Sequence, residues 1–181
     1  MGRCSWASSE RLKKYHDLEW GVPSHDDNYL FKMLILEGFQ AGLSWDIILK
    51  KRKAFQEAFE GFDPKVVSRF DDEKVDKLMS NVTLIRNRLK MISAIKNASA
   101  FLAIQQEFGS FDRYIWHFTN NTSLDPKIAT EEELMAKTPL SEKVSKDLKK
   151  RGFKFVGPVI IQSYLEAIGI YNHHLMSCDW H

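Results

Sequence analysis

Residues 30–45 have the sequence LFKMLILEGFQAGLSW, and we expect the rest of the chain to pack around them. Residues 30–36 are apolar except for one lysine, and a helix that is apolar on nearly every side is buried. Glu37 follows directly, and helical spacings of three, four and seven residues place it on an apolar face. That face carries Leu30, Met33 and Leu34. The sequence therefore predicts a buried helix whose carboxylate points into the protein.

A buried carboxylate is costly unless it is neutralised, hydrogen-bonded or paired with a cation. Glu37 is therefore either a structural carboxylate, held by a buried arginine or by backbone amides, or a functional group with a displaced pKa. Gly42 is predicted to break the helix, and Ser44 to cap the next one. Because Gln40 and Trp45 flank the same break, the functional interpretation gains weight.

Composition sets the outer limits of the interpretation. The 181 residues are 44% hydrophobic and 12% aromatic, which fits one domain with a substantial core. Lys and Arg number 26 against 24 acidic residues, so the net charge of +2 leaves room only for a local basic face. No signal peptide or membrane-spanning run is recognisable, and two cysteines make a stabilising disulfide improbable. We expect a cytoplasmic monomer with no membrane contact.

Apolar residues recur at helical spacing along the whole chain, and no segment alternates as a strand does. This predicts an all-α protein that forms a single domain over residues 1–181. A long helix is predicted over residues 84–107, with Leu89 on its buried stripe and Lys90 on its exposed side. An acidic helix is predicted over residues 130–137, followed by a proline that ends it.

Residues 141–169 are predicted to form a helix, a tight turn and a second helix. The turn runs from Gly152 to Gly157, with apolar residues between the glycines that pack inward. Free backbone amides at the start of the second helix then face outward near Gly157 and form an anion site. The basic residues around it are Lys149, Lys150, Arg151 and Lys154. They suit DNA phosphates, although an ordinary helical hairpin with a solvated basic face stays open.

Four potential metal ligands lie near the two ends of the chain. Cys4 and His16 are close to the start, and His174 and Cys178 are close to the end. Two thiolates and two imidazoles form a closed tetrahedral zinc set, which is structural rather than catalytic. The spacing of four residues to Cys178 favours His174 over His173. Free thiols with surface histidines are the alternative.

Large aromatic side chains stand out in the mostly polar residues 1–25, among them Trp6, Tyr15 and Trp20. They are either a staple for the fold or the wall of a pocket, and a staple is the simpler interpretation.

Several uncommon motifs carry a resemblance to a known family. The segments RCSW (3–6), YHDLEWGVP (15–23), LEGFQAGLSW (36–45) and KKRGFKFVGP (149–158), with the terminal His174 and Cys178, are similar to DNA-3-methyladenine glycosylase I. The match runs essentially end to end. It implies the helix-hairpin-helix DNA glycosylase fold, with one structural zinc ion joining residues 1–25 to residues 170–181. The implied ligands are Cys4, His16, His174 and Cys178.

The resemblance also implies roles for individual residues. Glu37 is the implied catalytic residue of a base pocket that contains Tyr15 and Trp45, with Trp6 and Trp20 as further walls. Leu43 is the implied side chain that fills the gap left by a flipped nucleotide. The implied DNA contacts of the hairpin are Lys150, Arg151, Gly152, Lys154 and Gly157.

Two departures from the superfamily limit the expected chemistry. Asn172 and His173 stand where many members carry a catalytic Asp, and Pro158 and Val159 stand where strand-cutting members carry a Lys. We predict hydrolytic removal of 3-methyladenine from alkylated double-stranded DNA as the free base, without strand cleavage. One rival is a non-catalytic helix-hairpin-helix DNA-binding module. The other is a zinc hydrolase, which needs an open coordination position that a full Cys2His2 set lacks.

Overall fold

A computed structural model describes residues 2–181, and helices make up its regular structure. In chain order the elements are α1 (Glu10–Leu18), α2 (Asp27–Gln40), α3 (Trp45–Ala58), η1 (Glu60–Phe62), α4 (Pro64–Val67), α5 (Asp72–Ser80), α6 (Arg88–Phe108), α7 (Phe111–Trp116), η2 (His117–Thr119), η3 (Glu131–Glu133), α8 (Pro139–Lys150) and α9 (Pro158–Ala167). Within residues 2–181 there is no β-strand, and Leu124 and Tyr171 form an isolated bridge. The predicted all-α class is confirmed.

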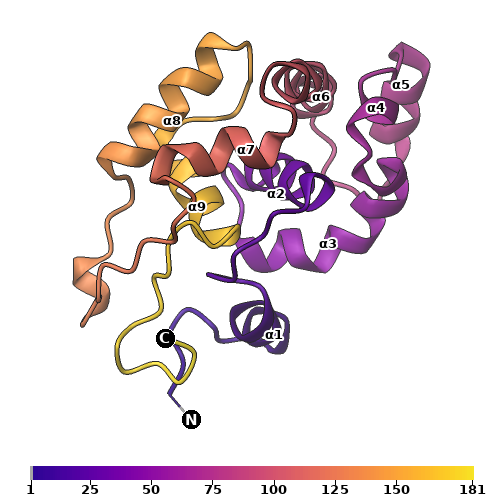
Figure 1. Ribbon diagram of the computed structural model, residues 1–181. Coiled ribbons are helices and arrows are strands. Elements are labelled where there is room, and N and C mark those ends of the chain that lie inside the picture. The colour runs from indigo at the N-terminus through magenta and orange to yellow at the C-terminus, as the bar shows by residue number, and fades with distance from the viewer. Residues whose placement is uncertain (1) are drawn as a thin grey trace.

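Helix α2 runs through the centre of the molecule, with α3, α6, α7 and α9 packed around it (Figure 1). Nine of its residues between Leu30 and Phe39 are buried, and Glu37 is one of them. The helix begins after Asp26, whose Oδ1 accepts a hydrogen bond from the backbone N–H of Tyr29 at 2.7 Å. A side chain that accepts from the first turn satisfies an otherwise unpaired amide. The predicted buried helix is confirmed.

The end of α2 is the break that the sequence predicts. Gly42 has φ of +80°, a left-handed conformation that glycine adopts at little cost. Ser44 then caps α3, since its side chain accepts from the backbone N–H of Ile47. The side chain of Gln40 donates from Nε2 to the carbonyl of Leu43 at 2.7 Å and so closes the loop. Four residues of loop, 41–44, therefore separate two well-defined helices.

The predicted pattern of α6 is wrong at its N-terminal end. The helix begins at Arg88 after the cap Asn87, Leu89 is 64% exposed, and Lys90 is only 7% exposed. Lys90 is buried because its ammonium donates to two backbone carbonyls, at 2.8 Å and 2.7 Å. Apolar spacing assigns every lysine to the solvent side, so it misses a lysine whose charge is satisfied inside the protein.

The predicted acidic helix over residues 130–137 is also wrong. Only the short 3-10 helix η3 forms there, and the neighbouring chain is irregular. Pro139 begins α8 instead of ending a helix, because proline fits the first helical position. Thr138 caps α8, and its hydroxyl accepts from the backbone N–H of Ser141, whose own hydroxyl accepts from the Thr138 N–H.

Helices α8 and α9 pack on each other as a hairpin, and α9 packs against α2.

The two ends of the chain lie together beside α1 (Figure 1). Gly2 and Asp179 exchange two hydrogen bonds, both of 3.0 Å. None of the helices in residues 2–181 combines the length and apolar character that crossing a lipid bilayer requires.

Gly169, just after α9, is a point where the chain tolerates no side chain. Its φ is +77°, and a Cβ there would lie 2.3 Å from the backbone of Val22 and Pro23. We expect Gly169→Ala to lower the free energy of unfolding by about 3 kcal/mol, because left-handed strain and overpacking add. Urea unfolding measures this loss. The matched control is Gly152→Ala, at φ +94° with nothing within 4 Å of the added Cβ. Equal losses in the two variants would contradict the steric explanation.

Candidate functional site

A cavity of about 420 Å³ opens beside the C-terminal half of α2. It is lined by α1 and the segments on either side of it, by α2, α3 and α9, and by the segment between η3 and α8. Its lining includes five aromatic or acidic side chains from the first half of the chain and one carboxylate from α9: Trp6, Tyr15, Trp20, Glu37, Trp45 and Glu166. The structure thus brings together all five residues that the sequence analysis assigned to a base pocket, from segments up to 39 residues apart in the sequence.

Glu37 lies on the cavity wall and is only 4% exposed. Within residues 2–181 no group donates a hydrogen bond to its carboxylate, and no cation pairs with it. Burial raises the pKa of Glu37 well above its usual value, and the negative charge of Glu166 adds to the effect. The interpretation of Glu37 as a structural carboxylate held by an arginine or by amides is therefore wrong. The carboxylate is available to a cationic or hydrogen-bond-donating ligand.

Tyr15 and Trp45 form an aromatic corner of the cavity. Their ring centroids lie 5.4 Å apart, with an angle of 59° between the ring planes. Burial, followed by the charge of Glu37, raises the pKa of Tyr15, so its hydroxyl stays protonated and can donate. The Nε1–H of Trp45 is buried and has no acceptor within residues 2–181. Two aromatic faces, two donors and one carboxylate therefore meet at one place, which suits a flat, positively charged ring.

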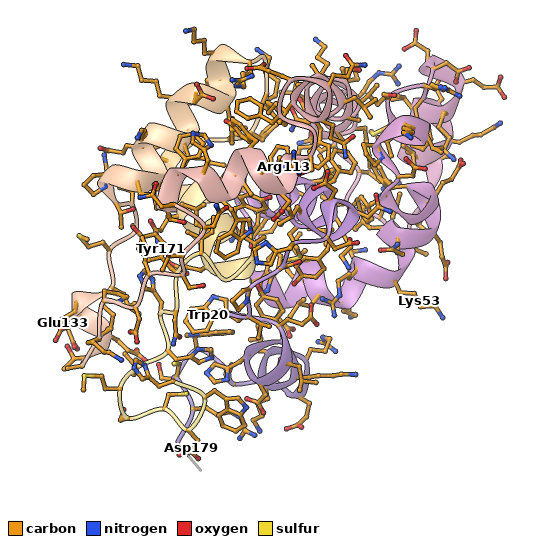
Figure 2. The ribbon with its side chains drawn as sticks, viewed as in Figure 1. Trp20, Lys53, Arg113, Glu133, Tyr171 and Asp179 are labelled. Atoms are coloured by element: carbon orange, nitrogen blue, oxygen red, sulfur yellow. The ribbon has the colours of Figure 1, made fainter. Side chains whose placement is uncertain are left out.

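Trp6 and Trp20 extend the aromatic wall toward the ends of the chain. They meet edge to face with centroids 4.9 Å apart. Trp20 also stacks on His16 at 5.9 Å and touches the ring of His174 at 4.7 Å. Figure 2 shows Trp20 between α1 and the C-terminal segment. These residues are both a staple for the fold and a wall of the cavity, so the two interpretations of the N-terminal aromatics are compatible.

Sequence reasoning missed a second carboxylate on the cavity wall, Glu166 of α9. Its Oε1 accepts from Nε2 of Gln162 at 2.9 Å and lies 2.8 Å from Nδ1 of His173. The signal was available, because Gln162 and Glu166 are polar side chains four residues apart on a mostly apolar helix. Glu166 adds negative charge to the cavity that faces Glu37.

Cys4, His16 and Cys178 form a buried cluster whose ligand atoms all lie within 4.8 Å of one another. This geometry fits a metal ion, and the two cysteines are free thiols. His174, the fourth predicted ligand, lies beside the cluster with its ring centroid 4.6 Å from that of His16. Its Nδ1 is 2.9 Å from Oδ1 of Asn172, and its Nε2 is 3.3 Å from the carbonyl of His16. The structure thus brings three of the four predicted ligands together and leaves His174 adjacent to them.

The surroundings of the cluster orient His16 for metal binding. Its Nδ1–H donates to Oδ1 of Asp17 at 2.8 Å, and Asp17 is held by the guanidinium of Arg3. This bond orients the ring so that Nε2 faces the cluster, where it accepts from the backbone N–H of Cys4 at 3.5 Å and lies 3.5 Å from Sγ of Cys178. Burial lowers the pKa of His174 to about 4, so its imidazole is neutral, the form that binds metals. His173 lies outside the cluster because its ring pairs with Glu166.

The predicted DNA-contacting groups lie at two separate turns. Leu43 is half-buried in the loop between α2 and α3. In the hairpin turn Phe153 and Val156 are buried, as predicted, and Lys154 is exposed. No side chain caps the start of α9 at Gly157, so the first amides of that helix remain free for an anion.

Arg151 differs from the lysines beside it. Its guanidinium pairs with Glu107 at 2.7 Å and with Asp147 at 2.8 Å, and its side chain is 24% exposed. It also lies 5.1 Å from the ring centroids of Phe108 and Tyr114. The charge of Arg151 is already paired within the fold, whereas Lys149, Lys150 and Lys154 are exposed to solvent.

Comparison with known proteins gives a consistent result. A family model described as methyladenine glycosylase matches residues 6–181. DNA-3-methyladenine glycosylase 1 of Escherichia coli is 42% identical over 179 residues, which cover 98% of this chain and 96% of that protein. DNA-3-methyladenine glycosylase of Haemophilus influenzae is 39% identical over 97% of this chain and 96% of its own length.

Solved structures agree with the sequence comparison. A crystal structure of a 3-methyladenine DNA glycosylase I superimposes with a TM-score of 0.96 at 41% identity, covering 99% of this chain and 100% of that one. The enzyme of Staphylococcus aureus, solved to explain its recognition of 3-methyladenine, also gives 0.96, at 37% identity over 99% of this chain and 96% of that one. Similarity of this extent, over the whole cavity and both ends of the chain, shows that this chain belongs to the methyladenine glycosylase family.

Proposed function

We propose that this chain is a DNA repair glycosylase that removes 3-methyladenine from alkylated double-stranded DNA by hydrolysis. The observation that carries the proposal is the carboxylate of Glu37, buried on the wall of an aromatic cavity and without an internal partner. The names of the relatives specify the same base. A non-catalytic DNA-binding module accounts for the hairpin but leaves this cavity unexplained.

The proposed mechanism uses the positive charge of the damaged base. Adenine methylated at N3 is cationic in DNA, so its glycosidic bond is weak and the base leaves without protonation. The enzyme extrudes the nucleotide, at a cost of a few kcal/mol that is smallest for damaged bases. Glu37 accepts hydrogen bonds from the base and stabilises its charge, while Tyr15 and Trp45 present aromatic faces to it. Leu43 fills the space that the nucleotide leaves in the duplex, and water attacks C1′ of the sugar.

The same site supports base removal without a lyase step. Strand cleavage of that kind begins when an amine forms a Schiff base with the sugar. No lysine of residues 2–181 lines the cavity, and Pro158 and Val159 occupy the start of α9. We therefore propose a monofunctional enzyme that releases free 3-methyladenine. We also propose that it acts as a monomer.

We further propose one structural zinc ion, held by Cys4, His16 and Cys178 with His174 as the fourth ligand. Two thiolates and two neutral imidazoles are the donor set that zinc prefers in closed sites. The ion would join the first and last segments of the chain. The zinc hydrolase alternative is disfavoured, because all three clustered ligands are buried and the cluster lies behind Trp20, away from the cavity.

Chromatography of the bases released from methylated duplex DNA tests the proposed activity. We expect the purified protein to release free 3-methyladenine and to leave the strand uncut, apart from breakage at abasic sites. A borohydride trapping experiment should give no covalent protein–DNA product, since no Schiff base forms. Retained DNA binding without release of any methylated base would establish the binding-module alternative.

A further inference from the structure

Helix α6 carries two buried polar side chains that the proposed chemistry does not use. Lys90 is 7% exposed and Asn97 is 4% exposed. They are seven residues apart, which is about two helical turns, so they lie on the same face about 10 Å apart along the axis. A buried polar group must be satisfied to be tolerated, and both of these are satisfied by backbone atoms of distant segments.

Lys90 holds the C-terminal end of α2. Its Nζ donates to the carbonyl of Phe39 at 2.8 Å and to the carbonyl of Ala41 at 2.7 Å. Carbonyls at the end of a helix lack partners within it, and the helix dipole favours a cation there. Ala41 is followed at once by Gly42 and Leu43, so Lys90 fixes the point from which the Leu43 loop departs.

Asn97 holds the hairpin turn between α8 and α9. Its Nδ2 donates to the carbonyl of Lys154 at 2.9 Å, and its Oδ1 accepts from the N–H of Lys154 at 2.8 Å. Two hydrogen bonds to one residue fix both the position and the orientation of that peptide. The next residue, Phe155, has φ of +55°, which a bulky residue adopts only where its surroundings impose it. Asn97 therefore fixes the middle of the turn, with the side chain of Lys154 exposed.

We propose that Lys90 and Asn97 are positioning residues that set the distance between the Leu43 loop and the hairpin turn. This inference rests on the proposed function, in which both turns meet the same DNA duplex. Two contacts on a rigid body reinforce each other only when their spacing matches the target. Helix α6 supplies the rigid spacing. Lys90 attaches the Leu43 loop to this helix, and Asn97 attaches the hairpin turn to it. A displacement of about 1 Å at such a site can cost about 100-fold in rate.

The test compares two binding reactions in the whole protein. Lys90→Met keeps the aliphatic stem and removes the donor, and Asn97→Ala removes both bonds to Lys154. We expect each variant to bind free 3-methyladenine within about twofold of wild type, because neither residue lines the cavity. We expect affinity for a duplex with a tetrahydrofuran abasic-site analogue to fall by at least about tenfold in each. Lys53→Met is the charge control, since Lys53 is 91% exposed on α3 (Figure 2).

Salt dependence separates positioning from direct DNA contact. A lysine that contacts a phosphate contributes about −0.9 to the slope of log K against log salt. Lys90→Met should leave this slope unchanged, since Lys90 acts through Leu43, whereas Asn97→Ala should make it shallower, since the hairpin contacts phosphates. A slope that changes by about one in Lys90→Met would overturn the proposal.

Other outcomes are equally decisive. Equal losses of free-base and duplex affinity would show a general structural role and overturn the inference. Folded variants that bind the duplex as tightly as wild type would also overturn the inference. In that case the proposed function would still stand, provided that the wild type releases 3-methyladenine. If Lys90→Met fails to fold, Lys90→Gln replaces it, and if Asn97→Ala fails to fold, Asn97→Ser replaces it, because each keeps a polar side chain that is too short to make the same bonds. The same tenfold loss of duplex affinity is expected there.

Discussion

Glu37→Gln is expected to lower the rate of 3-methyladenine release by at least about 100-fold, the usual loss when one preorganised electrostatic group is removed from a site. The substitution keeps the size and shape of the side chain, removes its charge and replaces one acceptor oxygen by an NH2 donor. The cavity then loses its main attraction for a cationic base, because Glu37 has no internal cation to compete for it. Chromatography of released bases under single-turnover conditions measures the effect. Free 3-methyladenine should also bind the variant more weakly.

The matched control for this prediction is Glu57→Gln on α3. Glu57 is 69% exposed and lies outside the cavity, so the same substitution there alters only the surface and should leave release unchanged. Undiminished release by Glu37→Gln would remove Glu37 from the mechanism and leave the aromatic faces as the source of recognition.

The stability of Glu37→Gln provides a second readout, because the pKa of Glu37 is raised in the folded protein. The folded state therefore binds this proton more tightly than the unfolded state does. The contribution of Glu37 to stability is fully present below the pKa that its carboxyl has in the unfolded chain. It is lost as the pH rises through the higher pKa that the same carboxyl has in the folded protein. Glu37→Gln should thus be at least as stable as wild type at neutral pH, and the difference should shrink as the pH falls toward the ordinary range of a glutamate. Urea unfolding at several pH values measures it.

Local patterns were enough to predict the buried helix α2, its break at Gly42 and the buried position of Glu37. Each depends on residues that are neighbours in the sequence, whose spacing fixes which face they share. Leu89 and Lys90 were predicted the wrong way round for a reason of the same kind. The carbonyls that satisfy Lys90 lie at the C-terminal end of α2 and just beyond it, about 50 residues away, and no local pattern records them.

Two further differences between the sequence analysis and the structure also depend on distant partners. The spacing of Glu166 from Gln162 indicates a shared polar face, but its place on the cavity wall beside His173 depends on how distant segments pack. Arg151 looks like a free cation in the sequence, yet Glu107 lies 44 residues earlier and pairs with it. Sequence spacing predicts which residues share a face, whereas the pairing of charges depends on how the helices pack.

Cys4→Ser is expected to abolish zinc binding and to lower the melting temperature by about 10 °C or more. Zinc in closed sites contributes about 10–16 kcal/mol of apparent binding free energy in small zinc-finger peptides, and even a fraction of that is large for this chain. Cys4 belongs to the N-terminal segment and Cys178 to the C-terminal one, and both are buried in one cluster with His16. Losing the ion would therefore release both ends of the chain, together with the wall that Trp6 builds. Metal analysis and thermal unfolding measure the two effects.

His25→Asn is the control for this prediction, because His25 is exposed and lies outside the cluster. It should keep one zinc ion per chain and a melting temperature near that of wild type. A chelator should lower the melting temperature of the wild type and of His25→Asn but not that of Cys4→Ser. If Cys4→Ser keeps its melting temperature and loses only its activity, the metal is catalytic and the zinc hydrolase alternative gains support. If Cys4→Ser keeps both, the cluster binds no ion that matters to the fold, because a buried structural site cannot be emptied without cost.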